Sequence, residues 1–249
     1  MEDKLYRLAY RTHYERAKAD ANRVIVDALS TYGDRCAVGL SGGKDSMAML
    51  GMILQHCKPL VIYNDSGLDL PDSLPTVQSA CDLHGLDLLI AKPEKDMLQL
   101  LKEVGTNGLN DISAKWLDQH IIINPVKAVI ERHRIQLEFI GIRAAESKGR
   151  KIAIKKLGAH HLSQRFGCGI AWPLRYWDAR DTLACIDELN LPLHPAYLRT
   201  SAACPRESIR ISWALWGQNS TVKSEEIAYV RRYYPEFYNK IQDLLGAHA

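Results

Sequence analysis

The residues with the clearest capacity for chemistry lie between positions 36 and 52, which read C-A-V-G-L-S-G-G-K-D-S-M-A-M-L-G-M. Residues 36–40 form a short apolar run of the length that a buried strand needs, and apolar residues at helical spacing resume at Met47. A tight polar loop separates these two elements and consists of Ser41, Gly42, Gly43, Lys44, Asp45 and Ser46. The spacing therefore predicts a strand, a glycine-rich loop and the N-terminus of a helix, in this order.

A loop in this position is suited to hold a phosphate group. Its glycines let backbone N–H groups approach an anion, the helix dipole favours negative charge, and Lys44 supplies a positive charge. The loop is not a Walker P-loop, which needs the pattern G-x-x-x-x-G-K-(S/T), because here Ser-Gly-Gly precedes Lys-Asp-Ser. We interpret the segment as a nucleotide site.

Length and composition are those of an ordinary globular protein. The chain has 249 residues, of which 47% are hydrophobic and 24% charged, enough for one α/β domain of about 200 residues with an appendage. It contains no run of about eighteen apolar residues, and its start lacks the apolar segment of a signal peptide. We therefore expect a soluble, cytoplasmic protein without a membrane partner.

Charge and cysteine placement exclude some classes and leave others open. Six cysteines occur without any C-x-x-C pair, which argues against a zinc ribbon and against a secreted disulfide scaffold. The formal net charge of +3 is too small to indicate a nucleic-acid partner. Five basic residues nevertheless crowd positions 148–156. They form either a solvated surface or an anion-facing segment near the nucleotide or a polyanionic substrate.

The first half of the chain alternates between strand and helix patterns. One or two helices are expected over residues 4–30, strands over 60–63, 86–91 and 137–142, and helices over 71–84, 94–104 and 119–134. This alternation predicts a three-layer fold, a parallel sheet covered by helices on both faces. Ligands bind beyond the C-terminal strand ends of such sheets, where Ser41, Asp65 and Arg143 fall.

The second half changes character. Residues 143–169 are basic and interrupted by glycines, and we expect a mobile loop over the site. A short strand at 170–174, a helix at 178–189 and two helices near 207–217 and 223–245 are expected to follow. We therefore divide the chain into N-terminal helices (1–34), a nucleotide-binding α/β domain (35–200) and a C-terminal helical extension (201–249).

Three further segments accompany the glycine-rich loop. Residues 64–68 read N-D-S-G-L after the second strand, residues 141–147 read G-I-R-A-A-E-S after a later strand, and residues 172–178 read W-P-L-R-Y-W-D before a helix and an L-P turn. In this order, residues 36–205 resemble the phosphoadenosine phosphosulfate (PAPS) reductase family. That family belongs to the PP-loop enzymes, or adenine nucleotide alpha hydrolases, which act at the α–β phosphate link of ATP.

The resemblance implies roles for individual residues. The loop residues Ser41 to Ser46, together with Gly141 and Arg143, match positions that bind the nucleotide, and Lys44, Asp45 and Arg143 match catalytic ones. The planar guanidinium of Arg143 can hold two phosphate oxygens. Asp45 either orients the loop or binds Mg²⁺, or it only stabilises the helix N-terminus. Asp65 either caps the turn beside the adenosine or forms an ordinary Asx turn.

The chain departs from the family at its cysteines. Sulfonucleotide reductases use a cysteine in a C-terminal E-C-G-(I/L)-H segment, whereas no cysteine follows Cys204 here. The Cys-Cys and C-x-x-C pairs of the iron–sulfur members are missing too, so we expect no iron–sulfur cluster. Cys204 is the cysteine nearest the family's active-site turn and remains a candidate catalytic or persulfide-bearing residue. Cys168 is the other cysteine in a loop-like setting.

These observations favour a PP-loop enzyme that binds ATP with Mg²⁺ and cleaves or transfers at the α–β phosphate. The acceptor would be adenylated in a sulfur-transfer or modification pathway. Nucleic acid or protein as acceptor, a cysteine desulfurase or thiol donor as partner, and a homodimer all stay open. One alternative is a reductase of PAPS or adenylyl sulfate. Another is a nucleotide-binding sensor or partner subunit without turnover.

Overall fold

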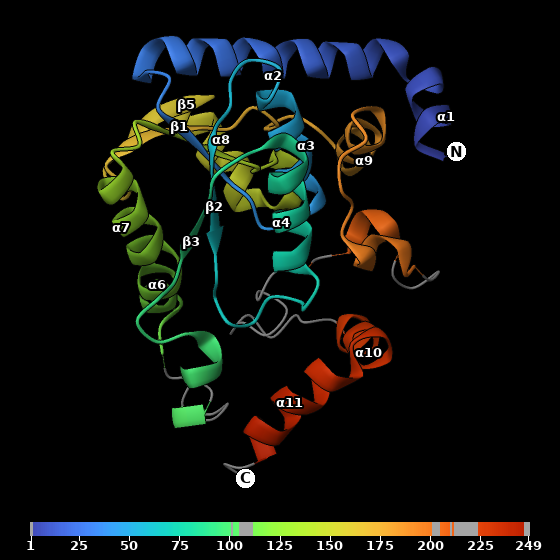
Figure 1. Cartoon of the computed structure of the whole chain (residues 1–249). Helices are drawn as coiled ribbons and strands as arrows, with labels where there is room; N and C mark the ends of the chain where they lie inside the picture. Colours follow the sequence, from blue (N-terminus) through green and yellow to red (C-terminus); the bar gives the residue numbers. More distant parts are fainter. Residues whose placement is uncertain are drawn as a thin grey trace.

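A six-stranded sheet forms the centre of the computed structural model, which describes residues 2–100, 102–104, 112–200, 205–209, 211 and 224–246. The strand order is β3-β2-β1-β4-β6-β5, and every neighbouring pair is parallel except β5 with β6. Figure 1 labels β1, β2, β3 and β5 of this sheet. The strands are β1 (Cys36–Gly39), β2 (Leu60–Asn64), β3 (Leu88–Ala91), β4 (Leu137–Ile140), β5 (His160–Ser163) and β6 (Cys168–Ala171). The chain leaves β1 toward β2 on one side and reaches β4 on the other, so the topological switch point lies between β1 and β4.

Helices cover both faces of this sheet. The larger helices are α1 (Glu2–Ala9), α2 (Arg11–Tyr32), α3 (Lys44–Ile53), α4 (Ser73–His84), α7 (Asn124–His133), α8 (Lys148–Leu157), α9 (Ala179–Glu188), α10 (Ser224–Tyr233) and α11 (Pro235–Gly246). The shorter ones are α6 (Ala114–Leu117), the π-helix η1 (Asp118–Ile123) and the 3₁₀ turns η2 (Ala144–Glu146), η3 (Pro195–Leu198) and η4 (Arg206–Ser208). No described helix has the length and apolarity that a membrane span requires.

Alternation along the strands separates two hydrophobic cores. Val38 and Phe139 pack with apolar side chains of α2, α3, α4 and α9 on one face. Ala37 and Ile170 pack with side chains of α7 and α8 on the opposite face. Successive strand residues point to opposite faces, so both faces of the parallel sheet are buried. The predicted three-layer α/β fold is confirmed.

The two C-terminal helices pack beyond the C-terminal ends of the strands, where α10 and α11 lie in Figure 1. Tyr229 and Tyr234 share a cluster with Leu70, which follows β2, and with Tyr197 of η3. Ile241 joins a second cluster of residues that follow β2 and β3. The single helix predicted over 223–245 is interrupted at Pro235, because proline cannot donate a helical hydrogen bond and favours the first position of a new helix. A C-terminal helical part is therefore present.

The segment 143–169 differs most from its prediction. Instead of a mobile loop it forms η2, α8, the edge strand β5 and the start of β6. Ser147 caps α8 by accepting the Arg150 N–H at 3.1 Å, and Ile154 anchors the helix in the core below it. Two of the glycines that suggested a loop lie at the ends of these elements, with φ of 82° at Gly158 and 76° at Gly167.

Two smaller differences concern helices. The helix expected at 119–134 begins earlier and is divided into α6, η1 and α7. Most of the helix predicted near 207–217 lies outside the described residues, and its first part forms the 3₁₀ turn η4. The division of the chain at residues 34 and 200 stays a prediction.

Candidate functional site

The loop of residues 41–46 joins β1 to α3, and Gly42 lies where a side chain would be crowded by backbone. Gly42 has a φ of 78°, and a Cβ atom there would lie 3.0 Å from the carbonyl oxygen of Ser73. Gly43 is the N-cap of α3, with extended backbone and a φ of −70°. The first turn of a helix has N–H groups without helical acceptors, so the loop and α3 together offer donors to an anion.

Two hydroxyl groups hold this loop in shape. Ser46 Oγ donates a hydrogen bond to the carbonyl of Gly43 at 3.0 Å and accepts one from the N–H of Ser41 at 3.2 Å. Ser41 Oγ lies 3.2 Å from Ser46 Oγ and accepts the Gly43 N–H at 3.4 Å. These hydrogen bonds, all within the loop, fix its shape.

Three charged side chains meet at the start of α3. The carboxylate of Asp45 lies 2.8 Å from Nε of Arg143 and 3.5 Å from Nζ of Lys44. Lys44 is 6% exposed and Arg143 5% exposed. Burial lowers the pKa of Lys44, and the Arg143 guanidinium adds to that effect while Asp45 opposes it. Two buried cations thus share one carboxylate, and the surplus positive charge favours a further anion.

The close packing of β4 against α3 brings Arg143 to this place. A Cβ atom at Gly141 would lie 3.0 Å from the amide nitrogen of Ser46 and 3.1 Å from the carbonyl carbon of Asp45. Glu146 fixes the following turn, because its carboxylate accepts the Arg143 N–H at 2.9 Å and pairs with Arg150. The structure therefore brings together the predicted residues of the loop, Gly141 and Arg143 at the switch point between β1 and β4.

Tyr197 is a site residue that the sequence analysis missed. Its hydroxyl accepts the backbone N–H of Lys44 at 3.1 Å, and Lys44 Nζ lies 5.7 Å from the centre of its ring. Burial raises the pKa of Tyr197, so the phenol is neutral and keeps a proton to donate. The signal that could have indicated Tyr197 was its place in the P-A-Y segment after the L-P turn. Glu146 could have been found in the same way, from its place in the G-I-R-A-A-E-S segment.

Three other candidates lie apart from this cluster or outside the described residues. Asp65 follows β2 as predicted, but its carboxylate pairs with Lys92 at 3.7 Å. Cys168 lies buried in β6 instead of a loop, and burial raises the pKa of its thiol to about 12. Cys204 lies outside the described residues.

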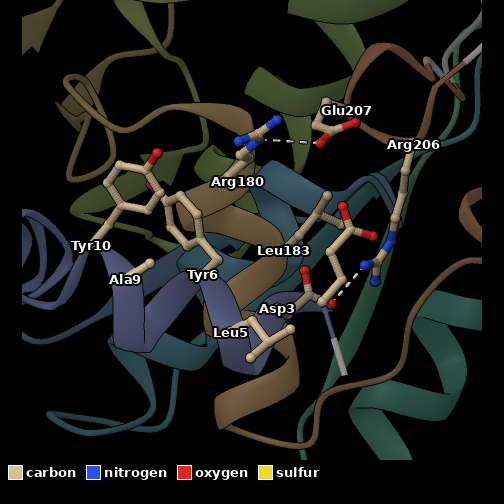
Figure 2. Close-up of a pocket in the computed structure, with 10 residues that line it drawn as sticks. Asp3, Leu5, Tyr6, Ala9, Tyr10, Arg180, Leu183, Arg206 and Glu207 are labelled. Carbon is tan, nitrogen blue, oxygen red and sulfur yellow. Dashed lines mark hydrogen bonds and ion pairs between the residues drawn. The ribbon is translucent and has the colours of Figure 1, made fainter.

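A hollow of about 250 Å³ occurs elsewhere, between α1, α9 and η4 (Figure 2). Its lining includes Tyr6, Leu183 and two ion pairs, Arg206 with Asp3 at 2.6 Å and Arg180 with Glu207 at 3.4 Å. Each cation there has its own carboxylate. We therefore place the candidate site at the glycine-rich loop, where two buried cations share one carboxylate, and not in this hollow.

Solved structures share the fold at low sequence identity. Phosphoadenylyl-sulfate reductase from Candida auris matches with a TM-score of 0.55 and 18% identity over 74% of this chain and 89% of that chain. FMN adenylyltransferase from Candida glabrata, in complex with ATP, matches with a TM-score of 0.56 and 12% identity over 75% of this chain and 58% of that chain. Among curated proteins, none matches this sequence.

A third similar structure corrects one prediction. The U34-tRNA thiolase NcsA from Methanococcus maripaludis has a TM-score of 0.55 and 18% identity over 93% of this chain and 80% of that chain, and its structure contains a 4Fe–4S cluster. The expectation of no iron–sulfur cluster is therefore wrong. It assumed that a cluster in this fold requires the cysteine pairs of the reductases, whereas a thiolase of the same fold carries one.

The cysteines in the described part of the chain do not make up a ligand set for such a cluster. Cys36 and Cys57 have sulfur atoms 3.5 Å apart, while Cys81, Cys168 and Cys185 are buried on other elements. Three of these thiols do not converge anywhere among the described residues.

The family comparison covers most of the chain. The family described as the phosphoadenosine phosphosulfate reductase domain matches residues 35–212, which include β1, the glycine-rich loop, Arg143 and Tyr197. The order of motifs, the switch-point site and this match agree. The chain belongs to the phosphoadenosine phosphosulfate reductase domain family.

Proposed function

We propose that the protein binds ATP at the loop of residues 41–46 and transfers the adenylyl group to an acceptor. The observation that carries this proposal is the buried cluster in which Lys44 and Arg143 share the single carboxylate of Asp45 beside the N-terminus of α3. A polyphosphate would supply the missing negative charge at a place where N–H donors are also available.

In the proposed reaction, a nucleophile of the acceptor attacks the α-phosphorus of ATP. The acceptor–phosphorus bond forms, the bond to the α–β bridging oxygen breaks, pyrophosphate leaves, and the acceptor's proton passes to water. Negative charge grows on the pyrophosphate during this step. Lys44 and Arg143 would stabilise that charge, since both are preorganised in a largely buried setting.

Tyr197 would complete the phosphate site. Its hydroxyl already accepts the Lys44 N–H, so its own proton can be donated to a phosphate oxygen. Asp45 fits a shared Mg²⁺ site, because Mg²⁺ in such enzymes is bound by one or two carboxylates together with substrate phosphates. The ion would neutralise phosphate charge, and Asp45 would hold it once Arg143 turns to the nucleotide.

The similar proteins support this class of chemistry. An FMN adenylyltransferase that binds ATP and a tRNA thiolase share the fold. An adenylylated acceptor is a good target for a sulfur nucleophile, because AMP is a good leaving group. We therefore place the reaction in a sulfur-transfer or modification pathway with a separate thiol or persulfide donor.

The experiment is incubation of the protein with ATP and Mg²⁺, followed by separation of the nucleotide products. AMP and pyrophosphate are expected, slowly without the true acceptor. Lys44→Ala should weaken ATP binding by about 1–3 kcal/mol in calorimetry, and Arg143→Ala should reduce turnover more than binding. ADP and phosphate as main products would exclude the proposed cleavage, and ATP binding without turnover, even with candidate acceptors, would favour a sensor.

The family match favours a second candidate, reduction of PAPS or adenylyl sulfate. That reaction needs a thiol that attacks the sulfate sulfur, and Cys204 is the cysteine nearest the family's active-site turn. We expect no sulfite from PAPS with thioredoxin and reductant, and we expect Cys204→Ser to keep AMP formation. Sulfite released by the wild type and abolished in Cys204→Ser would reverse the ranking of the two enzymes.

A further inference from the structure

Helix α8 concentrates positive charge on the surface of the protein. The chain has 32 basic and 29 acidic residues, and α8 (Lys148–Leu157) holds five of the basic and none of the acidic ones. Outside this helix, acidic residues outnumber basic ones, so the net positive charge of the protein resides in α8. Such a local surplus attracts polyanions even when the whole chain is nearly neutral.

The lysines of α8 form a regular row on its solvent side. Lys148, Lys151 and Lys155 follow one another at helical spacing and span about 10 Å along the axis. All three are exposed, and Ile154 is the residue of this helix that is buried against the sheet. None of the three lysines pairs with an acidic side chain within the part of the chain that the structure describes. Their charges are thus available to a partner.

This row begins beside the candidate site. Ser147, the N-cap of α8, follows directly on η2, whose turn carries Arg143 at its start and Glu146 at its end. A linear polymer bound along the lysines would therefore reach the nucleotide loop at the N-terminal end of α8. The same backbone turn fixes the position of both the lysine row and Arg143.

An exposed aromatic ring lies on the neighbouring loop. The N–H of Ala144 in η2 donates to the carbonyl of Arg175 at 2.8 Å, which holds the loop after β6 against the Arg143 turn. The next residue, Tyr176, is 65% exposed, and the Arg175 guanidinium lies 4.6 Å from the centre of its ring. Nucleic-acid bases stack on rings of this kind beside backbone-binding cations.

We propose that the lysine row of α8 and Tyr176 form a binding surface for single-stranded nucleic acid, whose phosphates contact the lysines and one of whose bases stacks on Tyr176. The inference rests on the proposed function in one respect: the bound strand would be the acceptor of the adenylyl group. A membrane fits less well, since Ile152 is the single apolar side chain among the lysines of this face. An acidic protein would use the lysines but has no evident use for an exposed ring.

The test measures binding of a labelled 12-nucleotide RNA and of the matching DNA strand by fluorescence anisotropy at several salt concentrations. Lys148→Ala/Lys151→Ala/Lys155→Ala is compared with Lys4→Ala/Lys58→Ala/Lys240→Ala, which removes the same charge from exposed positions elsewhere. The α8 variant should bind at least tenfold more weakly, and the slope of log affinity against log salt should fall by about 2. The control variant should change affinity less than threefold. Equal losses in the two variants would overturn the proposal.

Tyr176 provides the second arm. Tyr176→Ala should weaken strand binding about tenfold, whereas Tyr176→Phe keeps the ring and should bind as the wild type does. The melting temperature of each variant checks that it is folded. Tighter binding of poly-glutamate or of anionic lipid vesicles than of the RNA, at equal charge, would overturn the nucleic-acid assignment.

The nucleotide reaction is assayed separately on the wild type without any strand. AMP formation without strand binding would leave the proposed function standing and overturn the surface. Strand binding that depends on α8 and Tyr176, without AMP formation, would support the binding surface and contradict the proposed function.

Discussion

The nucleotide loop and the hollow beneath α1 use similar residues in different arrangements. Arginine, carboxylate and tyrosine side chains occur in both. In the loop, Lys44 and Arg143 are buried and share the carboxylate of Asp45. In the hollow, Arg180 and Arg206 each have a carboxylate of their own, and the Arg180 side chain is mostly exposed. The hollow is a concavity with balanced charges, and the loop carries the uncompensated charge.

This difference shows which feature indicates chemistry. Balanced pairs near the surface fix the position of a helix and contribute little energy. Buried cations in excess are costly unless an anion completes them, so a fold that retains them is organised for a ligand. The glycines at 42 and 141 support this interpretation, because each permits a backbone approach that a side chain would prevent.

Asp45→Ala should separate the two regions most clearly. Removal of the shared carboxylate leaves two largely buried cations without compensation, so the free energy of unfolding should fall by about 3 kcal/mol. Added pyrophosphate should restore stability more in the variant than in the wild type, because it replaces the lost negative charge. Denaturant unfolding with and without pyrophosphate measures both effects.

Asp65→Ala is the matched control, at the end of the neighbouring strand β2. Its carboxylate pairs with the exposed Lys92 at 3.7 Å, so the loss should stay below about 1 kcal/mol. Equal destabilisation by the two substitutions would show that the Lys44–Asp45–Arg143 cluster has no special electrostatic role.

A second prediction concerns a buried carboxyl group that pairs with no cation among the residues that the structure describes. Glu138 of β4 is 3% exposed, and burial raises its pKa to about 8. The folded protein keeps this proton up to about pH 8, whereas the unfolded chain loses it near pH 4.5. Stability should therefore fall as the pH rises from 4.5 to 8, by about 1.4 kcal/mol for each unit of pKa difference.

Glu138→Gln isolates this effect, because glutamine cannot ionise. The variant should gain stability relative to the wild type at pH 8.5 and lose that advantage at pH 4.5, as measured by unfolding in urea. A difference between the two proteins that does not change with pH would show that Glu138 ionises alike in both states.

The parts of the site that sequence could predict are those fixed by neighbours along the chain. The loop of residues 41–46 lies in one segment, and Arg143 follows a strand that had to end at the same sheet edge. Tyr197 could not be assigned, because its contact with Lys44 joins residues 153 positions apart. Glu138 resembled an ordinary charged residue at a strand, and only its central position in the sheet makes it buried.

Segment 143–169 is a part of the fold that the sequence pattern predicted wrongly. Its lysines and glycines are typical of a loop, and one buried apolar residue does not make a clear helical pattern. Ile154, packed in the core, and the Ser147 cap stabilise this helix over the sheet. Tertiary packing, and not local propensity, decided this element.

A third prediction tests the steric side of the comparison. Gly141→Ala places a Cβ atom 3.0 Å from the amide nitrogen of Ser46, so β4 and α3 must separate slightly. Overpacking of this kind costs about 1–3 kcal/mol, and ATP affinity should fall with it because Arg143 moves away from the loop. Gly149→Ala in α8 is the control, since the nearest heavy atom, Ser147 Oγ, lies 3.9 Å away. Unaltered ATP affinity in Gly141→Ala would show that this approach does not shape the site.

The smallest effect is expected in the hollow. Arg180 lies in the first turn of α9, where the helix dipole disfavours a positive charge, and its pair with Glu207 spans 3.4 Å from a mostly exposed arginine to a partly exposed carboxylate. These two contributions oppose each other, so Arg180→Ala should change the free energy of unfolding by about 0.5 kcal/mol or less, in either direction. ATP affinity and AMP formation should stay as in the wild type, because the hollow shares no residue with the loop of residues 41–46. Calorimetry measures the ATP affinity, and a thermal melt measures the change in stability. A loss of ATP affinity comparable to that in Lys44→Ala would mean that the hollow belongs to the nucleotide site, and the distinction between balanced and surplus charge would no longer separate the two regions.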